Sequence, residues 1–147
     1  MKKVLIKEIK GEQINNALSL VWKVFNEFES PDYSQEGVDE FYKTLKNKSY
    51  LSTLRIFGAF ENDKLLGVIA TRKEGTHIAL FFVDGKYHRQ GIGRQLFETV
   101  LKYNHSGNMT VNSSPYAVDV YHRFGFYDTD YEQVVSGLRF VPMELKF

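Results

Sequence analysis

The fold is decided by residues 82–96, which run FVDGKYHRQGIGRQL. An apolar, strand-like run is followed by a polar loop, and helical periodicity begins at Ile92. Backbone N–H groups at a helix start lack intrahelical partners, and the aligned peptide dipoles place partial positive charge there. Gly91 and Gly93 have no Cβ, so an anionic group could approach the main chain closely. Arg89 and Arg94 would add positive charge at the rim, and the stretch therefore predicts an anion-binding loop.

Two common phosphate-binding patterns do not fit this loop. A dinucleotide fingerprint needs a third glycine three residues after the second, where this chain has Leu96. A P-loop needs four residues between its glycines and then Lys and Ser or Thr. Here five residues separate Gly85 from Gly91, and Ile92 follows. A glycine-rich strand-to-helix connection without any ligand remains the alternative.

Composition indicates an ordinary globular chain of one domain, residues 1–147. Hydrophobic residues make up 43% and charged residues 25%, and the net charge of +1 with no basic cluster gives no reason to expect nucleic acid. The absence of cysteine excludes disulfides and thiol catalysis, and the four histidines have no metal-ligand spacing, so we expect no metal. The first residues predict a strand and not a signal peptide, and no apolar run approaches a membrane span. We therefore expect a cytoplasmic protein.

The hydrophobic pattern predicts an α+β fold with a mixed sheet covered by helices. The helices are expected at 12–28, at 35–47, from Ile92 to about Tyr103, and from the Ser114 cap to Gly125. The strands are expected at 3–9, 54–61, 64–72, 76–83, 108–112, 126–130 and 135–147.

The glycine loop resembles the acyl-CoA pyrophosphate loop of the GNAT superfamily of N-acyltransferases. The family pattern is Arg or Gln, two residues, Gly, one residue, and Gly or Ala, and this chain has His88-Arg89-Gln90-Gly91-Ile92-Gly93. His88 departs from the pattern at its first position. The element order also matches the family over nearly the whole chain. The resemblance implies an α/β/α sandwich whose mostly antiparallel sheet is splayed at the strand that binds CoA.

A second segment resembles the family's other common motif. Ala117 lies four positions before Tyr121, and Gly125-Phe126 follow. In the family the small residue lets the pantetheine arm approach the helix, and the tyrosine is the usual general acid. A phenol with a pKa near 10 stays protonated at neutral pH and can donate to the departing thiolate. The family often has Asn where this chain has Ser114, while Asn112 lies two residues earlier, so either could contact the co-substrate.

The resemblance therefore implies a set of CoA-binding residues, in which Phe81, Phe82 and Val83 would act through their backbone groups. The set is Phe81, Phe82, Val83, His88, Arg89, Gln90, Gly91, Ile92, Gly93, Arg94, Asn112, Ser114, Ala117 and Tyr121.

An amine nucleophile also needs a proton acceptor. Glu29 is the first candidate, because it lies in the aromatic and acidic stretch 25–33, where the family usually builds its acceptor site. Asp32, His77 and Glu144 are further candidates, and a solvated or structural role remains open for each.

These observations predict an N-acetyltransferase that uses acetyl-CoA and a small-molecule amine by direct attack, without a cysteine for an acetyl-enzyme. A non-catalytic acyl-CoA sensor and a protein lysine or N-terminal acetyltransferase are the alternatives. We expect neither nucleic acid nor a membrane as partner, and residues 135–147 could form the edge of a homodimer.

Overall fold

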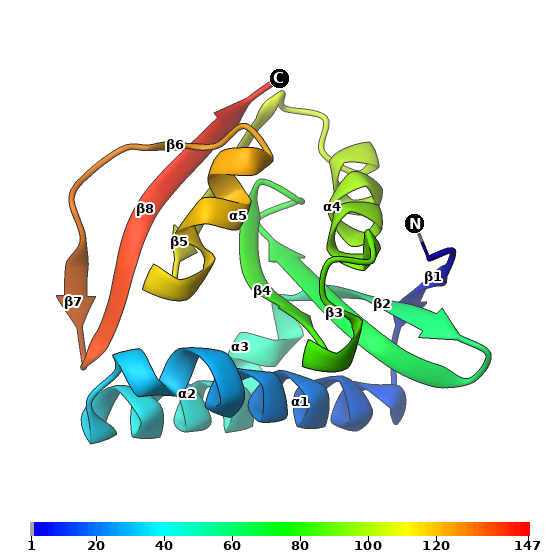
Figure 1. Ribbon diagram of the computed structural model, residues 1–147, viewed down its shortest axis with the longest axis horizontal. Helices are drawn as coiled ribbons and strands as arrows, with labels where there is room; N and C mark the ends of the chain where they lie inside the picture. Colours follow the sequence, from blue (N-terminus) through cyan, green and yellow to red (C-terminus); the bar gives the residue numbers. More distant parts are fainter. Residues whose placement is uncertain (1) are drawn as a thin grey trace.

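The computed structural model describes residues 2–147 and is built on a mixed sheet of eight strands (Figure 1). The sheet order is β1-β2-β3-β4-β5-β8-β6, and β7 pairs with β8. Neighbouring strands are antiparallel except β4 and β5, which are parallel. The strands are β1 (Leu5–Ile9), β2 (Arg55–Glu61), β3 (Lys64–Arg72), β4 (His77–Val83), β5 (Asn108–Ser113), β6 (Tyr127–Asp128), β7 (Gln133–Val135) and β8 (Leu138–Lys146).

Helices cover both faces of the sheet. The α-helices are α1 (Gln13–Val24), α2 (Gln35–Lys46), α3 (Lys48–Ser52), α4 (Ile92–Lys102) and α5 (Val118–Arg123). A π-helical segment, η1 (Phe25–Glu29), continues α1, and the 3₁₀ turns are η2 (Ser30–Asp32), η3 (Gly85–Tyr87) and η4 (Pro115–Ala117).

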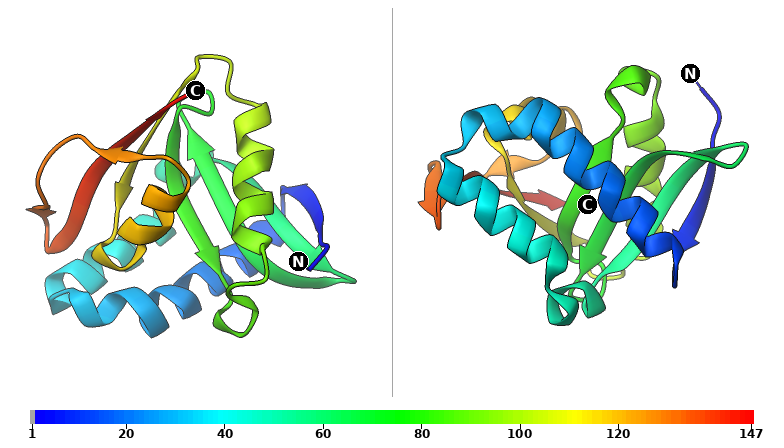
Figure 2. Two further views of the ribbon diagram at one scale, coloured as in Figure 1. Left: turned by 45° about the horizontal axis from the view of Figure 1, so that its top comes forward. Right: turned by 90° about the horizontal axis from the view of Figure 1, so that it is seen from below.

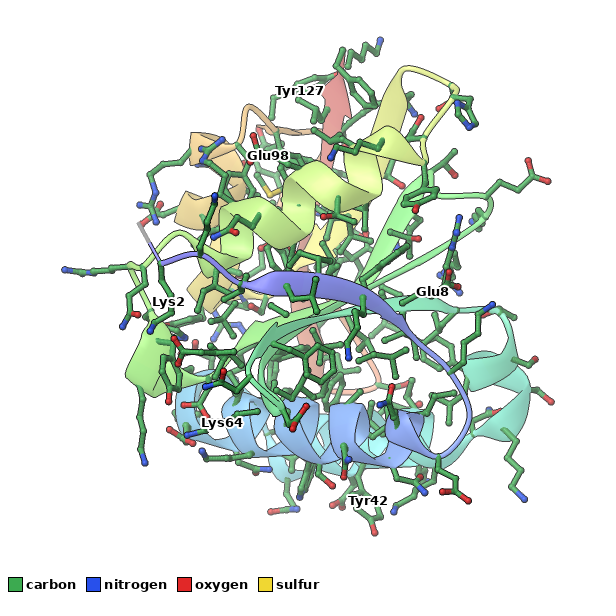
Figure 3. All side chains as sticks on the ribbon, turned by 90° about the vertical axis from the view of Figure 1, so that its right-hand side faces the viewer. Lys2, Glu8, Tyr42, Lys64, Glu98 and Tyr127 are labelled. Carbon is green, nitrogen blue, oxygen red and sulfur yellow. The ribbon has the colours of Figure 1, made fainter. Side chains whose placement is uncertain are left out.

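Two apolar cores lie on opposite faces of the sheet. One packs Ile92 and Leu96 of α4 against Leu66 and Met109. The other packs α1, through Val21 and Phe25, against residues such as Val68 and Leu80. Figure 3 looks along the sheet from β1 and shows α4 on one side and α1 with α2 on the other; the labelled Tyr42 points from α2 into solvent. Alternation along β3 and β4 therefore fills both faces with apolar side chains.

The strands β4 and β5 separate soon after they meet. Their ladder comprises His77 with Thr110 and Ile78 with Val111, and beyond it the two strands diverge toward α1 (Figures 1 and 2). The rest of β4 is still paired with β3 on its other edge, as far as Val83 opposite Gly67. Apart from the Val83 carbonyl, which His88 bonds, backbone groups on the open edge of β4 can therefore pair with a ligand. The α+β fold with a splayed sheet is confirmed.

Several boundaries differ from the sequence prediction. The helix expected at 12–28 changes to π geometry at Phe25, and the short α3, capped by the Asn47 side chain, was not expected. The strand expected at 126–130 shrinks to two residues. The tail expected as one strand is a hairpin, because Ser136 and Gly137 take positive φ angles of 51° and 79° between β7 and β8.

Most of the tail expected at a dimer edge is already paired within this chain. Strand β8 is paired with β5 on one side and with β6 and β7 on the other. An exposed edge at this end of the sheet belongs to β6 and β7 instead.

Candidate functional site

Two cavities meet where β4 and β5 diverge. The loop cavity, of about 500 Å³, lies between the end of β4, the start of α4 and the helix α5. The helix cavity, of about 340 Å³, lies between η1, α2, the diverging strands and the β7–β8 hairpin. Five residues line both: Glu29, Phe81, Phe82, Ala117 and Tyr121. A molecule in one cavity would therefore meet a molecule in the other at Glu29 and Tyr121.

The glycine loop presents a helix start to the loop cavity. Gly91 caps α4 with a φ of 82°, and Arg89 also has a positive φ, 62°, which is uncommon for a residue with a side chain. Ile92 is buried and anchors the first turn. A Cβ on Gly93 would lie 3.4 Å from the Phe81 ring, so the loop packs directly on β4. The N–H groups of the first turn of α4 can therefore receive an anion beside β4.

Side chains hold this loop against its neighbours. Asp84 accepts hydrogen bonds from the Lys86 N–H at 3.0 Å and from Lys23 Nζ of α1 at 3.2 Å. His88 Nε2 lies 2.6 Å from the Val83 carbonyl oxygen and, because that oxygen can only accept, carries the proton of this bond. The His88 ring also packs on Phe28 at 4.9 Å. His88, which departs from the family motif, thus ties the loop to the end of β4.

The rim of the loop cavity carries mostly basic side chains, together with the exposed carboxylate of Asp119. Arg89 and Arg94 are exposed there, as the sequence predicts, and Arg123 of α5 joins them. Arg123 was not foreseen, since nothing local in the sequence tells that α5 lies across from the loop. Gln90 does not line the cavity, and its side chain donates to the Lys86 carbonyl instead.

Tyr121 lies at the junction of the cavities with only 5% of its surface exposed. Phe81 and Phe126 pack edge-on against its ring. Within residues 2–147 its hydroxyl makes no hydrogen bond, although the atom is not sealed from solvent. Burial, reinforced by the negative charge of Glu29, raises the pKa of Tyr121 above its usual value. The phenol therefore stays protonated and is free to donate.

Glu29 faces Tyr121 from the last residue of η1. The Ser30 N–H bonds to the Phe25 carbonyl five residues back, and this wider turn is a feature often found at functional sites. Burial raises the pKa of Glu29 to about 8; the Ser114 hydroxyl opposes this shift and the nearby Asp32 adds to it. A carboxyl group with a pKa near neutrality can accept and release a proton under physiological conditions.

The other candidate bases lie outside the linings of both cavities. The Nδ1 of His77 is 2.8 Å from Thr110 Oγ1, and burial, with help from the charges of Arg72 and Lys73, lowers its pKa to about 4. Glu144 accepts a hydrogen bond from the Tyr127 hydroxyl at 3.1 Å. Asp32 acts on Glu29 only through its charge. Among the four candidates, Glu29 is the one that the fold brings to the junction.

Asn112 and Ser114 line the helix cavity and not the loop cavity. The Ser114 hydroxyl accepts from the Ala117 N–H at 3.3 Å, so it caps η4 as the sequence predicts and stands beside Glu29.

Sequence reasoning missed most of the helix cavity. Its further lining includes Glu40, Phe41, Tyr50, Arg139 and Phe140. These residues come from α2, α3 and β8, and no local motif connects them. Within the described residues, no three His, Asp or Glu side chains group as metal ligands, and no helix is long and apolar enough to cross a membrane.

Comparisons with known proteins agree with this architecture. A family model described as an acetyltransferase (GNAT) domain matches residues 29–147. A GCN5-related N-acetyltransferase from Rhodopseudomonas palustris superposes with a TM-score of 0.83 at 16% identity, covering 100% of this chain and 98% of that one. The PaiA N-acetyltransferase from Thermoplasma acidophilum, solved with coenzyme A, has a TM-score of 0.77 at 18% identity, covering 99% and 100%.

An acetyltransferase from Bacillus subtilis, also solved with CoA, has a TM-score of 0.62 at 20% identity and covers 99% of each chain. No curated protein shows a significant match to the chain. The family model spans well over half of the chain and includes the glycine loop, Tyr121 and Glu29. The chain therefore belongs to the GNAT superfamily of acetyltransferases and is an acyltransferase.

Proposed function

We propose that this protein transfers an acetyl group from acetyl-CoA to a primary amine of a small molecule, by direct attack of the amine on the thioester. The observation that carries this proposal is the junction of two cavities at a raised-pKa carboxyl group and a protonated phenol. One cavity would hold the donor and the other the acceptor.

The loop cavity fits an acyl-CoA. A pyrophosphate would accept from the N–H groups at the start of α4, with Arg89, Arg94 and Arg123 adding opposite charge. The apolar stretch Phe81–Val83 and the small Ala117 would flank the pantetheine arm. The open backbone edge of β4 could then pair with the amide groups of the pantetheine arm.

The chemistry follows from the groups at the junction. Glu29, when ionised, would take a proton from the ammonium form of the acceptor, so that the neutral amine forms a C–N bond to the thioester carbon. Backbone N–H groups near Phe82 would stabilise the charge on the carbonyl oxygen. As the C–S bond breaks, Tyr121 would give its proton to the CoA thiolate and be left as a phenolate. The attacking nitrogen loses its second proton as it becomes the amide nitrogen, and that proton would return to Tyr121. Glu29 would release the proton that it took from the ammonium to solvent, so both side chains regain their starting charge.

The placement of Glu29 also weighs against a non-catalytic sensor. Burying a carboxyl group raises the pKa of Glu29 to about 8, which means that its ionised form is disfavoured by the fold. A protein that only bound acyl-CoA would gain nothing from burying a carboxyl group at this unfavourable free energy. A general base for an amine needs a carboxyl group with such a raised pKa. The volume of the helix cavity, about 340 Å³, fits a small acceptor.

The replacement Tyr121→Phe tests the proposal. It keeps the ring packing and removes the proton donor, so kcat for CoA release should fall about 100-fold or more while the Kd for CoA changes little. Tyr127→Phe is the matched control, because Tyr127 is exposed and lines neither cavity. Unchanged turnover in Tyr121→Phe would remove this residue from the mechanism.

A further inference from the structure

The helix cavity carries a second carboxylate, Glu40, which the acyl transfer does not use. Glu40 lies on α2 and lines the cavity together with Phe41, Thr44 and Tyr50. The Thr44 hydroxyl donates to the Glu40 backbone carbonyl at 3.0 Å, so this hydroxyl does not serve the side chain. Within residues 2–147, the Glu40 carboxylate has neither a hydrogen bond nor an ion pair. It is a negative charge without a partner in the wall of the cavity.

An aromatic wall lies between the two carboxyl groups. Phe25 stacks on Tyr33 at a centroid distance of 5.5 Å and on Phe41 at 4.1 Å. Glu29 follows Phe25 by one helical turn, and its charge adds to burial in raising the pKa of Tyr33. Glu40 adjoins Phe41 in the sequence. The wall suits the methylene chain of an acceptor, and its ring faces tolerate a cation.

The positive charge in the lining is already neutralised. Arg139 is the one Lys or Arg side chain among the lining residues of the described chain. Its Nε and Nη2 donate to the Glu132 carboxylate at 3.0 and 3.2 Å, and its Nη1 donates to the Asp32 carbonyl at 3.0 Å. Burial raises the pKa of Tyr50 and the charge of Arg72 opposes this shift, but Arg72 itself does not line the cavity. An acceptor with a carboxylate would thus find no free cation among the described lining residues, and it would face Glu40.

We propose that the acceptor is a diamine or a longer polyamine, which binds with its reacting amine between Glu29 and Tyr121 and a second ammonium beside Glu40. This inference rests on the proposed amine acetylation. Glu40 is then a specificity-determining residue: it contacts the far end of the acceptor and takes no part in the bond exchange.

Three acceptors with the same four-carbon chain separate the possibilities: butylamine, putrescine and γ-aminobutyrate. They end in a methyl group, an ammonium and a carboxylate. With saturating acetyl-CoA, kcat/KM for putrescine should exceed that for butylamine about tenfold, the value of one charge-assisted contact, and γ-aminobutyrate should be poorest. Longer diamines and spermidine would then locate the best spacing between the amines.

The variant Glu40→Gln should raise KM for putrescine about tenfold, leave kcat nearly unchanged and leave butylamine unaffected. Glu36→Gln is the matched control, because Glu36 lies one turn earlier on α2, is exposed and does not line the cavity. A thermal melt of each variant checks that it is folded.

Equal kcat/KM values for butylamine and putrescine in the wild-type protein would overturn the diamine inference while leaving amine acetylation intact. This comparison needs no variant. Failure to acetylate any of the three amines, or longer polyamines, with acetyl-CoA binding retained, would instead count against the proposed function itself.

Discussion

The pH dependence of Glu29 gives the sharpest test of the proposed base. Its pKa is raised from 4.5 to about 8, chiefly by burial, so at pH 7 about one-tenth of the free enzyme would carry the ionised form and at pH 9 about nine-tenths. The ammonium fraction of a simple alkylamine stays almost constant over this range. With saturating acetyl-CoA, kcat/KM for the amine should therefore rise about tenfold between pH 7 and pH 9 and level off above pH 8.

The variant Glu29→Gln keeps the size of the side chain and removes the base. We expect kcat/KM to fall by about 10²–10⁴-fold and the rising limb near pH 8 to disappear. Glu27→Gln, on the same π-helical turn but exposed, should keep both the rate and the limb. A continuous assay of thiol release, with a reporter calibrated at each pH, measures this. Persistence of the same limb in Glu29→Gln would refute the assignment of the base to Glu29.

Three further predictions concern the same site. Because the pKa of Glu29 is raised in the folded state, its contribution to stability is full below pH 4.5 and is lost as the pH rises to about 8. Glu29→Gln should therefore melt at a higher temperature than the wild type at pH 8–9, and the difference in melting temperature should shrink toward pH 5. A Cβ at Gly37 would clash with the Gly137 carbonyl oxygen, so Gly37→Ala should push the β7–β8 hairpin off α2 and cost about 1–3 kcal/mol in denaturant unfolding. The same variant should raise KM for the amine more than KM for acetyl-CoA, and equal effects on both would contradict this role of the hairpin. Arg123→Ala should weaken CoA binding and reduce its salt dependence in calorimetry, and an unchanged Kd at low salt would show that Arg123 does not contact the anion.

The donor side of the site could be predicted because its signals are local. The change from strand to loop to helix at residues 82–96 fixes where the free N–H groups of α4 lie, whatever the rest of the chain does. Ala117 and Tyr121 are four residues apart, so they follow one another along a single helical stretch. Local spacing was enough to find these residues, and the fold then brings both groups to the loop cavity.

The acceptor side could not be predicted in the same way, because tertiary contacts build it. Glu40 and Arg139 are nearly a hundred residues apart and line one cavity, since the β7–β8 turn packs on the start of α2 through the close approach of Gly37 and Gly137 (Figure 1). A sequence pattern marks glycine in a turn but does not tell which backbone it will approach. Ser114 likewise has the predicted cap, yet its hydroxyl stands beside Glu29 in the helix cavity because the fold turns η4 toward η1.

The shift from α to π geometry at Phe25 had no signal in the apolar periodicity either. Pro31 marks the end of the helix, as predicted, but not the widened turn that precedes it. This turn carries Glu29 to the junction, so the role of Glu29 depends on a detail of backbone geometry that the sequence alone does not specify.

The central claim is that an amine in the helix cavity attacks a thioester in the loop cavity directly. Mass spectrometry of a reaction containing acetyl-CoA with an isotope-labelled acetyl group and putrescine tests it, with both the amine and the intact protein weighed over the first turnovers. We expect labelled monoacetylated amine to form in step with free CoA, with no label on the protein. A labelled protein that forms before the product, or tight CoA binding with no labelled amine, would contradict it.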